Sequence, residues 1–296
     1  MDISAKTLAY LFKSYSMAFQ GGLRSGQDVA EFMRFTLEVP SSGESNTYSW
    51  LGQFPKFREW VGERVVKKLS ADTYRVPNKL FESTIAVLRT QIEDDQDGLF
   101  GPLFAEMGIA AAEFPGDLVY DLMKLGTTEL CFDGKPFFAT DHPVGKEGEE
   151  VAVSNYGGGA GELWALMDTS RAIKPFIFQN RIAPSFPNMN TGDNLEMRDE
   201  YTYGGRARGA AGFGLWQLAF GSKASLDTTN FNNAMEALMS FKNDEGSDLK
   251  IRPDLLVCTP GNRAAAHVIL KAQNLASGET NTNFNVVDLL VTNQLS

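Results

Sequence analysis

The chain has 296 residues, of which 43% are hydrophobic and 22% are charged, enough to build one large core or two smaller ones. Its formal net charge of −10 disfavours a protein that grips nucleic acid through phosphates, because such proteins carry basic surfaces. Cys131 and Cys258 lie far apart without CxxC spacing, which excludes a disulfide framework and the usual structural zinc site. The presence of only two histidines lowers the expectation of hydrolytic or metal chemistry.

No stretch approaches the roughly 20 continuous apolar residues that span a bilayer. Residues 1–19 lack the apolar core of a signal peptide, because lysine and polar residues interrupt them every few positions. We therefore expect a soluble protein that is made in a cytoplasm and has no membrane partner.

The first 40 residues predict a short amphipathic helix. Apolar residues recur at helical spacing up to Phe19, and Gly21 and Gly22 are expected to end the helix. Little else nearby in the sequence could cover the apolar face, so we expect it to lie against a neighbouring subunit.

A cluster of aromatic residues follows a predicted loop near residue 45. Its members are Trp50, Phe54, Phe57 and Trp60. Together with Arg58 they could form a stacked anchor at a subunit contact, or they could be ordinary core residues, and the pattern supports both interpretations equally.

Residues 62–95 predict a long β-hairpin, with alternating charged and β-branched residues in its first arm and Phe81, Ile85 and Val87 in its second. A polar two-stranded ribbon is marginal alone in water, which points to assembly. Residues 99–125 predict one long helix with Asp97 as N-cap and Gly126 as its end. Pro115 is expected to kink or split this helix, because proline removes a hydrogen bond.

The second half of the chain predicts strands and then an α/β region. Residues 129–145 read as strand–turn–strand, 162–181 as a strand pair and 201–222 as one further strand. A helix over 227–246, capped by Asp227 or Thr228 and ended by Gly246, has Phe231, Met235, Leu238 and Met239 on its apolar face. A buried strand (252–259), a turn at Pro260–Gly261, a helix (262–274) and a last strand (283–295) follow.

Three groups of residues could carry chemistry, and the first is acidic. Glu93, Asp95, Asp97 and Gly98 resemble the start of a calcium loop, but position twelve holds Phe104 where a bidentate glutamate is needed. We interpret these acids as charges at a helix N-terminus.

The second group is Cys131 with Asp141 and His142, which could form a thiol–imidazole pair. No third group at a recognisable spacing orients the pair, and His142 precedes Pro143, so a structural turn histidine is favoured. The third group, Gly204–Gly209 with Arg206 and Arg208, has extended flanks and predicts a strand or loop rather than a phosphate cradle. His267 is expected to be a packed or half-exposed helix residue. We therefore expect no catalytic, cofactor-binding or metal site.

Four segments, in this order, resemble the Mu-like phage major head subunit family: FESTIAVLRTQIEDDQDGLF, DGKPFFATDHPVG, LWALMDTSRAIKPFIFQNR and RPDLLVCTPGNRAAAHVIL. The resemblance covers nearly the whole chain. It implies an α+β fold of the Hong Kong 97 capsid type. On that basis residues 1–60 are expected to form an N-terminal arm, 61–97 an extended E-loop, 98–126 the spine helix and 127–222 the sheet of a peripheral domain, and 223–296 an α/β axial domain.

The resemblance also implies a function, namely a major capsid protein that assembles as hexamers and pentamers into the icosahedral head around double-stranded DNA. The expected partners are further copies of the chain, a separate scaffold protein, a portal and a possible decoration protein, with packaged DNA touching the inner surface non-specifically. The expected location is the virion, assembled in the host cytoplasm. Lys67, Lys68 and Lys79 lie on the predicted ribbon, but no residue pattern supports an isopeptide cross-link.

Two rival functions remain open from the sequence. An encapsulin-like nanocompartment shares the same fold and would need a pocket for a cargo peptide. A hydrolase would use Cys131 or His142. The position of Pro115 further predicts a hinge that lets one sequence fit both pentamers and hexamers.

Overall fold

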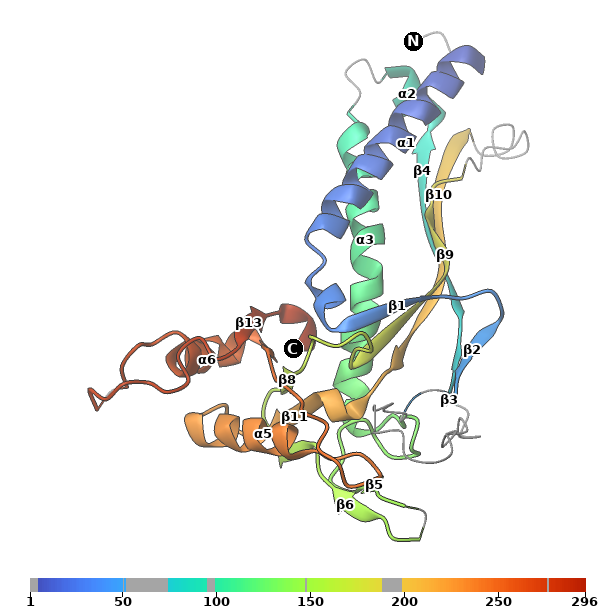
Figure 1. The fold of residues 1–296 in the computed structure, drawn as a ribbon. Helices are drawn as coiled ribbons and strands as arrows, with labels where there is room; N and C mark the ends of the chain where they lie inside the picture. Colours follow the sequence, from blue (N-terminus) through green and yellow to red (C-terminus); the bar gives the residue numbers. More distant parts are fainter. Residues whose placement is uncertain are drawn as a thin grey trace.

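The computed structural model describes residues 5–49, 51, 74–94, 99–146, 148–187, 199–275 and 277–296. Two long helices and a four-stranded sheet form an elongated upper part of the molecule, and a five-stranded sheet with two shorter helices forms the lower part (Figure 1). The predicted aromatic cluster from Trp50 to Trp60 lies outside the described residues, and so does the first arm of the predicted ribbon up to residue 73. None of the described helices is long and apolar enough to cross a membrane.

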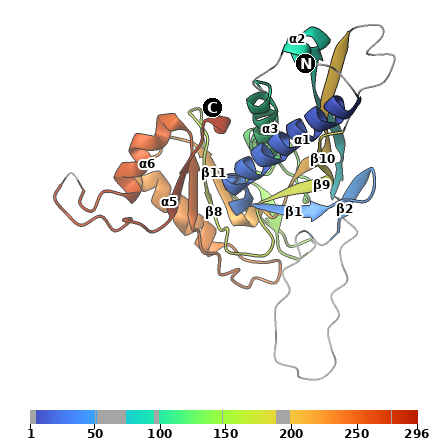
Figure 2. The same ribbon diagram turned by 90° about the horizontal axis from the view of Figure 1, so that it is seen from above.

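The helices α1 (Ala5–Asp28) and α3 (Gly101–Lys124) lie side by side against the four-stranded sheet (Figures 1 and 2). Tyr15 of α1 stacks on Phe104 of α3 at 4.4 Å and meets Tyr203 of the sheet edge-on at 5.4 Å between ring centroids. The expectation that the apolar face of the first helix needs a neighbouring subunit is therefore wrong, because α3 and the sheet of the same chain cover it.

The expected end of α1 at Gly21–Gly22 is also wrong, because the helix continues through both glycines to Asp28. Gly22 faces α3, where the two backbones approach so closely that no side chain fits between them. Burial against α3 compensates for the low helix propensity of glycine.

Helix α3 runs as one helix across Pro115, so Pro115 does not split it. Its N-cap is Phe100 without a side-chain cap, which corrects the expected cap at Asp97; Asp97 itself lies outside the described residues. The helix ends at Lys124, and Gly126 lies in the 3-10 turn η2 (Leu125–Thr127) that follows.

The four-stranded sheet has the order β1-β9-β10-β4. Its strands are β1 (Thr36–Pro40), β9 (Phe176–Ser185), β10 (Glu200–Phe213) and β4 (Lys79–Leu88). The predicted long hairpin is wrong in its pairing: β4 pairs antiparallel with β10, while β3 (Tyr74–Pro77) pairs with β2 (Ser45–Tyr48). Ile92 lies not in a strand but in the short helix α2 (Arg89–Asp94).

The five-stranded sheet has the order β13-β12-β8-β11-β7 and draws its strands from distant parts of the chain. They are β13 (Asp288–Val291), β12 (Leu255–Cys258), β8 (Trp164–Met167), β11 (Ala219–Lys223) and β7 (Tyr156–Gly159). Residues 162–181 therefore do not form a strand pair, because β8 and β9 belong to different sheets. Likewise 201–222 is two strands, β10 and β11, one in each sheet, joined by η3 (Trp216–Leu218).

The remaining elements either confirm the expectations or are shorter than expected. Helix α5 (Thr228–Ser240) begins at Asp227, whose side chain accepts the Asn230 amide hydrogen, but it ends before Gly246. Met239 of its predicted apolar face is exposed. Helix α6 (Arg263–Leu270) and the turn η4 (Pro260–Asn262) confirm their predictions, whereas residues 129–145 contain one regular strand, β5 (His142–Val144), which pairs with β6 (Val151–Val153). The 3-10 turns η1 (Glu31–Arg34) and η5 (Asn293–Leu295) complete the described elements.

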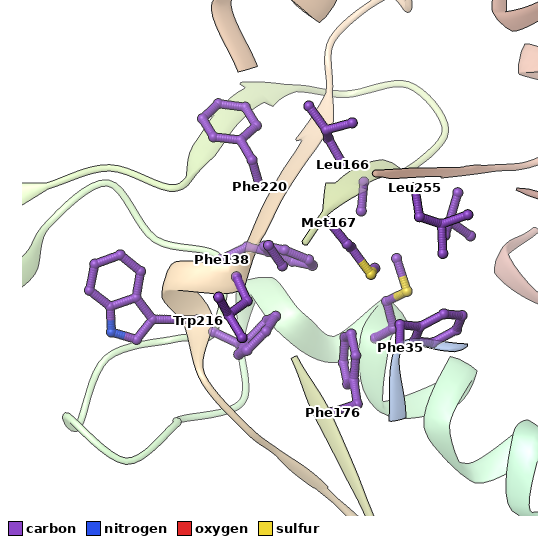
Figure 3. Packing of buried hydrophobic residues seen from close by; sticks show 14 of the residues in the cluster. Phe35, Phe138, Leu166, Met167, Phe176, Trp216, Phe220 and Leu255 are labelled. Carbon is purple, nitrogen blue, oxygen red and sulfur yellow. The ribbon is translucent and has the colours of Figure 1, made fainter. Parts of the chain in front are cut away.

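One hydrophobic core joins the two sheets. Figure 3 shows Phe35 and Phe176 from the region of the four-stranded sheet close to Met167 and Leu255 of the five-stranded sheet. Phe176 and Phe35 meet edge-on at 5.9 Å, and all four side chains are fully buried. The two parts of the molecule are therefore packed into one unit rather than linked by an open hinge.

Candidate functional site

The structure brings Cys131 and His142 together, but the acid between them is Asp133 and not Asp141. Asp133 accepts a hydrogen bond from His142 Nδ1 at 2.7 Å and one from the Cys131 thiol at 3.1 Å. Asp141 points elsewhere and forms an ion pair with Lys135 at the surface. Sequence reasoning missed Asp133, although its place two residues after Cys131 and immediately before Gly134 is typical of a turn in which an aspartate bonds back to the backbone.

A tight turn positions the Asp133 carboxylate. Cys131 N–H donates to the Lys135 carbonyl at 2.7 Å, and Gly134 has φ +76°, a value that favours glycine. Asp133 Oδ1 also accepts the Lys135 amide hydrogen at 3.0 Å. The turn thus presents the carboxylate to His142, which stands at the start of β5.

On its other side His142 contacts Asn155, which links β6 to β7. His142 Nε2 lies 3.1 Å from Asn155 Oδ1, and the ring stacks on Trp216 at 3.9 Å with an interplanar angle of 9°. His142 is completely buried. The expectation of a structural turn histidine fits this environment, in which every polar atom of the ring has a protein partner.

The electrostatics of this cluster do not suit a nucleophile. Burial, and next the adjacent Asp133 carboxylate, raise the pKa of the Cys131 thiol far above its ordinary value, so it is not a thiolate near neutral pH. Burial alone would also raise the pKa of Asp133, but the hydrogen bond and charge of His142 with the bonds from Cys131 and Lys135 hold that pKa below its usual value. A thiol that keeps its proton lacks the reactivity that cysteine catalysis needs.

Cys131, Asp133 and His142 also form the one group of three potential metal ligands that lie together in the described part of the chain. Their separations fit hydrogen bonds better than a metal ion. Two ligands about 2.0–2.1 Å from a tetrahedral zinc ion lie roughly 3.3 Å apart, whereas His142 Nδ1 and Asp133 Oδ2 are 2.7 Å apart.

The other residues singled out from the sequence do not converge on a site. Arg206 is exposed and Arg208 half-buried on β10, so the glycine–arginine stretch is a strand as expected. His267 lies on α6 but is exposed, so the expectation of a packed or half-exposed residue is wrong. Cys258 is buried in β12, where burial raises its pKa to about 11. Glu93 lies in α2, whereas Asp95, Asp97 and Gly98 of the calcium-like stretch lie outside the described residues.

The surface carries features that suit contacts between subunits. Strand β4 has a partner, β10, on one side, and no strand among the described residues pairs with its other edge. Its outward-facing Leu80 and Leu88 are exposed. At the opposite part of the molecule Met239, Val268 and Val286 are exposed beside the five-stranded sheet. Free strand edges and exposed apolar side chains are typical of surfaces that a partner covers.

A long helix packed on a four-stranded sheet, with a second sheet beside it, is the α+β fold of a shell-forming phage capsid protein of the Hong Kong 97 type, as the match to a phage procapsid subunit shows. Residues 8–295 match the family of the Mu-like prophage major head subunit gpT. The chain belongs to this family.

Relatives and solved structures agree. The chain is 36% identical to the major capsid protein of Escherichia phage Mu, covering 95% of this chain and 94% of that protein. It is also 36% identical to the FluMu prophage major head subunit of Haemophilus influenzae, covering 92% and 91%. The bacteriophage JBD30 procapsid subunit matches with a TM-score of 0.88 and 44% identity over 99% of this chain and 100% of that one. The JBD30 capsid subunit matches with a TM-score of 0.76 and 34% identity over 90% and 91%.

The chain is therefore the major capsid protein of a Mu-like tailed phage, a structural component of the virion that assembles with further copies of itself. The encapsulin-like alternative gains no support from these relatives. Lys79, considered for a cross-link, is an exposed residue of β4, while Lys67 and Lys68 lie outside the described residues.

Proposed function

We propose that this chain builds an icosahedral head from hexamers and pentamers and that this head encloses double-stranded DNA. The observation that carries the proposal is a match to the JBD30 procapsid subunit over 99% of the chain. The edge of β4 that has no partner strand among the described residues, and the exposed apolar residues beside the five-stranded sheet, supply surfaces that neighbouring subunits would bury.

The two sheets support a division of the subunit into two domains. The four-stranded sheet with α3 would form the peripheral domain. The five-stranded sheet with α5 and α6 would form the axial domain, which then includes β7, β8 and β11 and begins well before residue 223. Within residues 61–97, proposed as the E-loop, β3 pairs with β2, whereas β4 pairs with β10 and would belong to the peripheral sheet.

The N-terminal arm proposed for residues 1–60 would then consist mainly of α1 and β1. Helix α1 is held against α3, and β1 is an edge strand beside β9. The hinge at Pro115 stays a proposal. Pro115 lies within a continuous helix, where its missing N–H leaves one weaker turn that could bend.

Several partners are proposed besides further copies of the chain. The JBD30 capsid also exists decorated with trimers of a minor capsid protein, and a decoration protein of that kind would fit this head. A separate scaffold protein and a portal would be needed to start and close the shell. The net charge of −10 supports only non-specific contact with packaged DNA.

We also propose that the chain has no catalytic activity and binds no cofactor. The raised pKa of Cys131 and the fully partnered ring of His142 support this for the residues that a hydrolase would use. A cargo-loaded nanocompartment is the competing proposal, and it would require co-purification of a cargo peptide.

Electron microscopy of the purified full chain, expressed alone and with its neighbouring genes, tests the proposal. Shells, tubes, sheets or rings of hexamers and pentamers are the expected result. A persistent 32.5 kDa monomer under every condition would contradict it.

A further inference from the structure

Four segments meet around His142 at the connection between the two sheets. They are the turn at 131–135, the start of β5, the β6–β7 link at Asn155, and η3, which carries the chain from β10 of one sheet to β11 of the other. Side-chain hydrogen bonds join all of them. These hydrogen bonds therefore also fix how the crossover between the two sheets is packed.

The orientation of the Asn155 amide is determined by its surroundings. Asn155 Nδ2 donates to the carbonyl oxygens of Phe137 at 2.8 Å, Ala219 at 3.2 Å and Trp216 at 3.3 Å. Asn155 Oδ1 accepts the Ala139 amide hydrogen at 2.9 Å. The reverse orientation would set an oxygen against three carbonyls and an NH₂ group against an N–H, so Oδ1 is the atom that faces His142.

Both ring nitrogens of His142 therefore face acceptors. Nε2 points at Asn155 Oδ1, which has no hydrogen to give, and Nδ1 points at the Asp133 carboxylate at 2.7 Å. A neutral imidazole has one N–H and one lone pair, so it would leave a lone pair directed at an oxygen. Only a ring with hydrogens on both nitrogens satisfies the two acceptors.

We propose that His142 is held as a buried imidazolium cation that fastens segment 131–155 to the crossover between the two sheets. Its positive charge is balanced by the Asp133 carboxylate, and the face of Trp216 at 3.9 Å gives a further favourable contact for a cation.

The other groups around the ring do not compete for this charge. Cys131 contacts Asp133 as a neutral thiol, and Asn155 and Trp216 are uncharged. Lys135 and Asp141 pair with each other at the surface, where solvent screens them. The Asp133 carboxylate is the charged group that touches the ring.

The protonation of the His142 ring can be measured directly, because the chain has only one other histidine, His267, which is exposed. Full-length His267→Gln protein labelled with isotopic histidine would be studied by ring-nitrogen NMR near neutral pH, in subunits and in assembled shells. We expect both His142 nitrogens to carry hydrogen. One protonated nitrogen would overturn the proposal, and so would a stoichiometric metal ion found by elemental analysis together with a hydrogen-free Nδ1.

Two acid variants form a matched pair. In Asp133→Asn the His142 ring should lose the hydrogen from one of its two nitrogens. Asp141→Asn removes an exposed acid that is adjacent to His142 in the sequence, and in this variant both ring nitrogens should keep their hydrogens. A ring that stays doubly protonated in Asp133→Asn would contradict the pairing. If that variant does not fold, the measurement on the His267→Gln protein still decides.

Hydrogen exchange tests the fastening role. In His142→Gln, amides in peptides covering 131–155 and 216–221 should exchange roughly tenfold faster or more, while His267→Gln should leave them unchanged. Exchange in these peptides that is equal in the two variants would overturn the role assigned to the cation.

Discussion

Gly22 of α1 lies so close to Ala105 of α3 that a Cβ atom added to Gly22 would stand 1.9 Å from the Ala105 carbonyl oxygen. The reverse contact occurs one turn away, where a Cβ on Gly108 would lie 2.1 Å from the Phe19 carbonyl oxygen. The two glycines allow backbone-to-backbone packing along the helix pair. Side chains on both sides of this contact, including Phe19 and Phe104, then reach the sheet.

Replacing Gly22 with alanine should therefore weaken the attachment of α1. The added methyl group meets backbone and not a movable side chain, so the helices must separate, at a cost of about 1–3 kcal/mol. Urea unfolding of the subunit measures the loss.

Gly21→Ala is the matched control for this prediction. Gly21 is exposed on the same helix, and a Cβ atom added there would have no neighbouring atom within 4 Å. Alanine there should stabilise the helix by about 0.5–1 kcal/mol, because glycine has the lower helix propensity. Equal effects of both substitutions would show that the close approach does not govern α1 packing.

Gln179 should anchor the pair of β2 and β3 to the four-stranded sheet. Its side chain is completely buried, accepts the Tyr48 hydroxyl hydrogen at 2.7 Å, and donates to the Val76 carbonyl at 3.0 Å and to Asn78 at 2.9 Å. Gln179→Ala removes these three hydrogen bonds from a buried position, which costs roughly 1–3 kcal/mol. Limited proteolysis between Tyr48 and Tyr74 should become faster.

The neighbouring Asn180 offers a control for Gln179. It bonds Glu38 at 2.7 Å in a solvent-exposed setting, so Asn180→Ala should change stability and proteolysis little. The anchoring role is refuted if the two alanine variants are cleaved at the same rate.

Asp133 should make the subunit sensitive to acid. Its pKa lies below 3.8 in the folded protein, because the bonds and charge of His142 with the other donors outweigh burial. A depressed carboxyl pKa contributes stability that is present above the unfolded value and is lost as pH falls through the folded value. Urea midpoints measured downward from pH ~4 should fall more steeply for the parent protein than for Asp133→Asn, and parallel slopes would contradict this origin.

Tyr120 should make the subunit sensitive to alkali. Burial raises its pKa from 10.0 to about 12, while its hydrogen bond with Thr292 acts in the opposite direction. The stability that a raised pKa contributes is complete below the unfolded value of 10.0 and declines as pH rises toward the folded value. Tyr120→Phe should therefore reduce the fall in unfolding free energy at alkaline pH by on the order of 2 kcal/mol.

This difference can be measured as unfolding free energies on either side of pH 10, for the parent protein and Tyr120→Phe. Tyr48 and Tyr74 also have pKa values raised to about 12, so part of the alkaline loss should persist in the variant. If the unfolding free energy of Tyr120→Phe falls with pH above 10 as steeply as that of the parent protein, the Tyr120 hydroxyl ionises without unfolding the protein.

Local patterns predicted the elements whose residues decide their own structure. Four consecutive apolar residues identified β12, and the N-cap expected at Asp227 or Thr228 located the start of α5. Pairings between strands that are distant in the sequence could not be predicted in the same way. The strand β4 alternates as a hairpin arm would, but its partner β10 lies more than a hundred residues further along the chain. Nothing in the local pattern distinguishes such a partner from a nearby one.

The candidate site shows the same limit. Cys131 and His142 could be named from their side chains, whereas the role of Asp133 depends on a turn and that of Asn155 depends on a loop between two strands. The helix-ending role expected for Gly21 and Gly22 failed because α3 compensates for their low propensity, which is a tertiary effect.

The order of strands in the five-stranded sheet also has a consequence for biosynthesis. Strand β8 pairs on one side with β11 and on the other with β12, and both leave the ribosome long after it. A nascent chain therefore holds β8 without partners until most of the polypeptide has been made. Translation products that end before β12 would therefore lack one of the two partners of β8 and could not complete the five-stranded sheet.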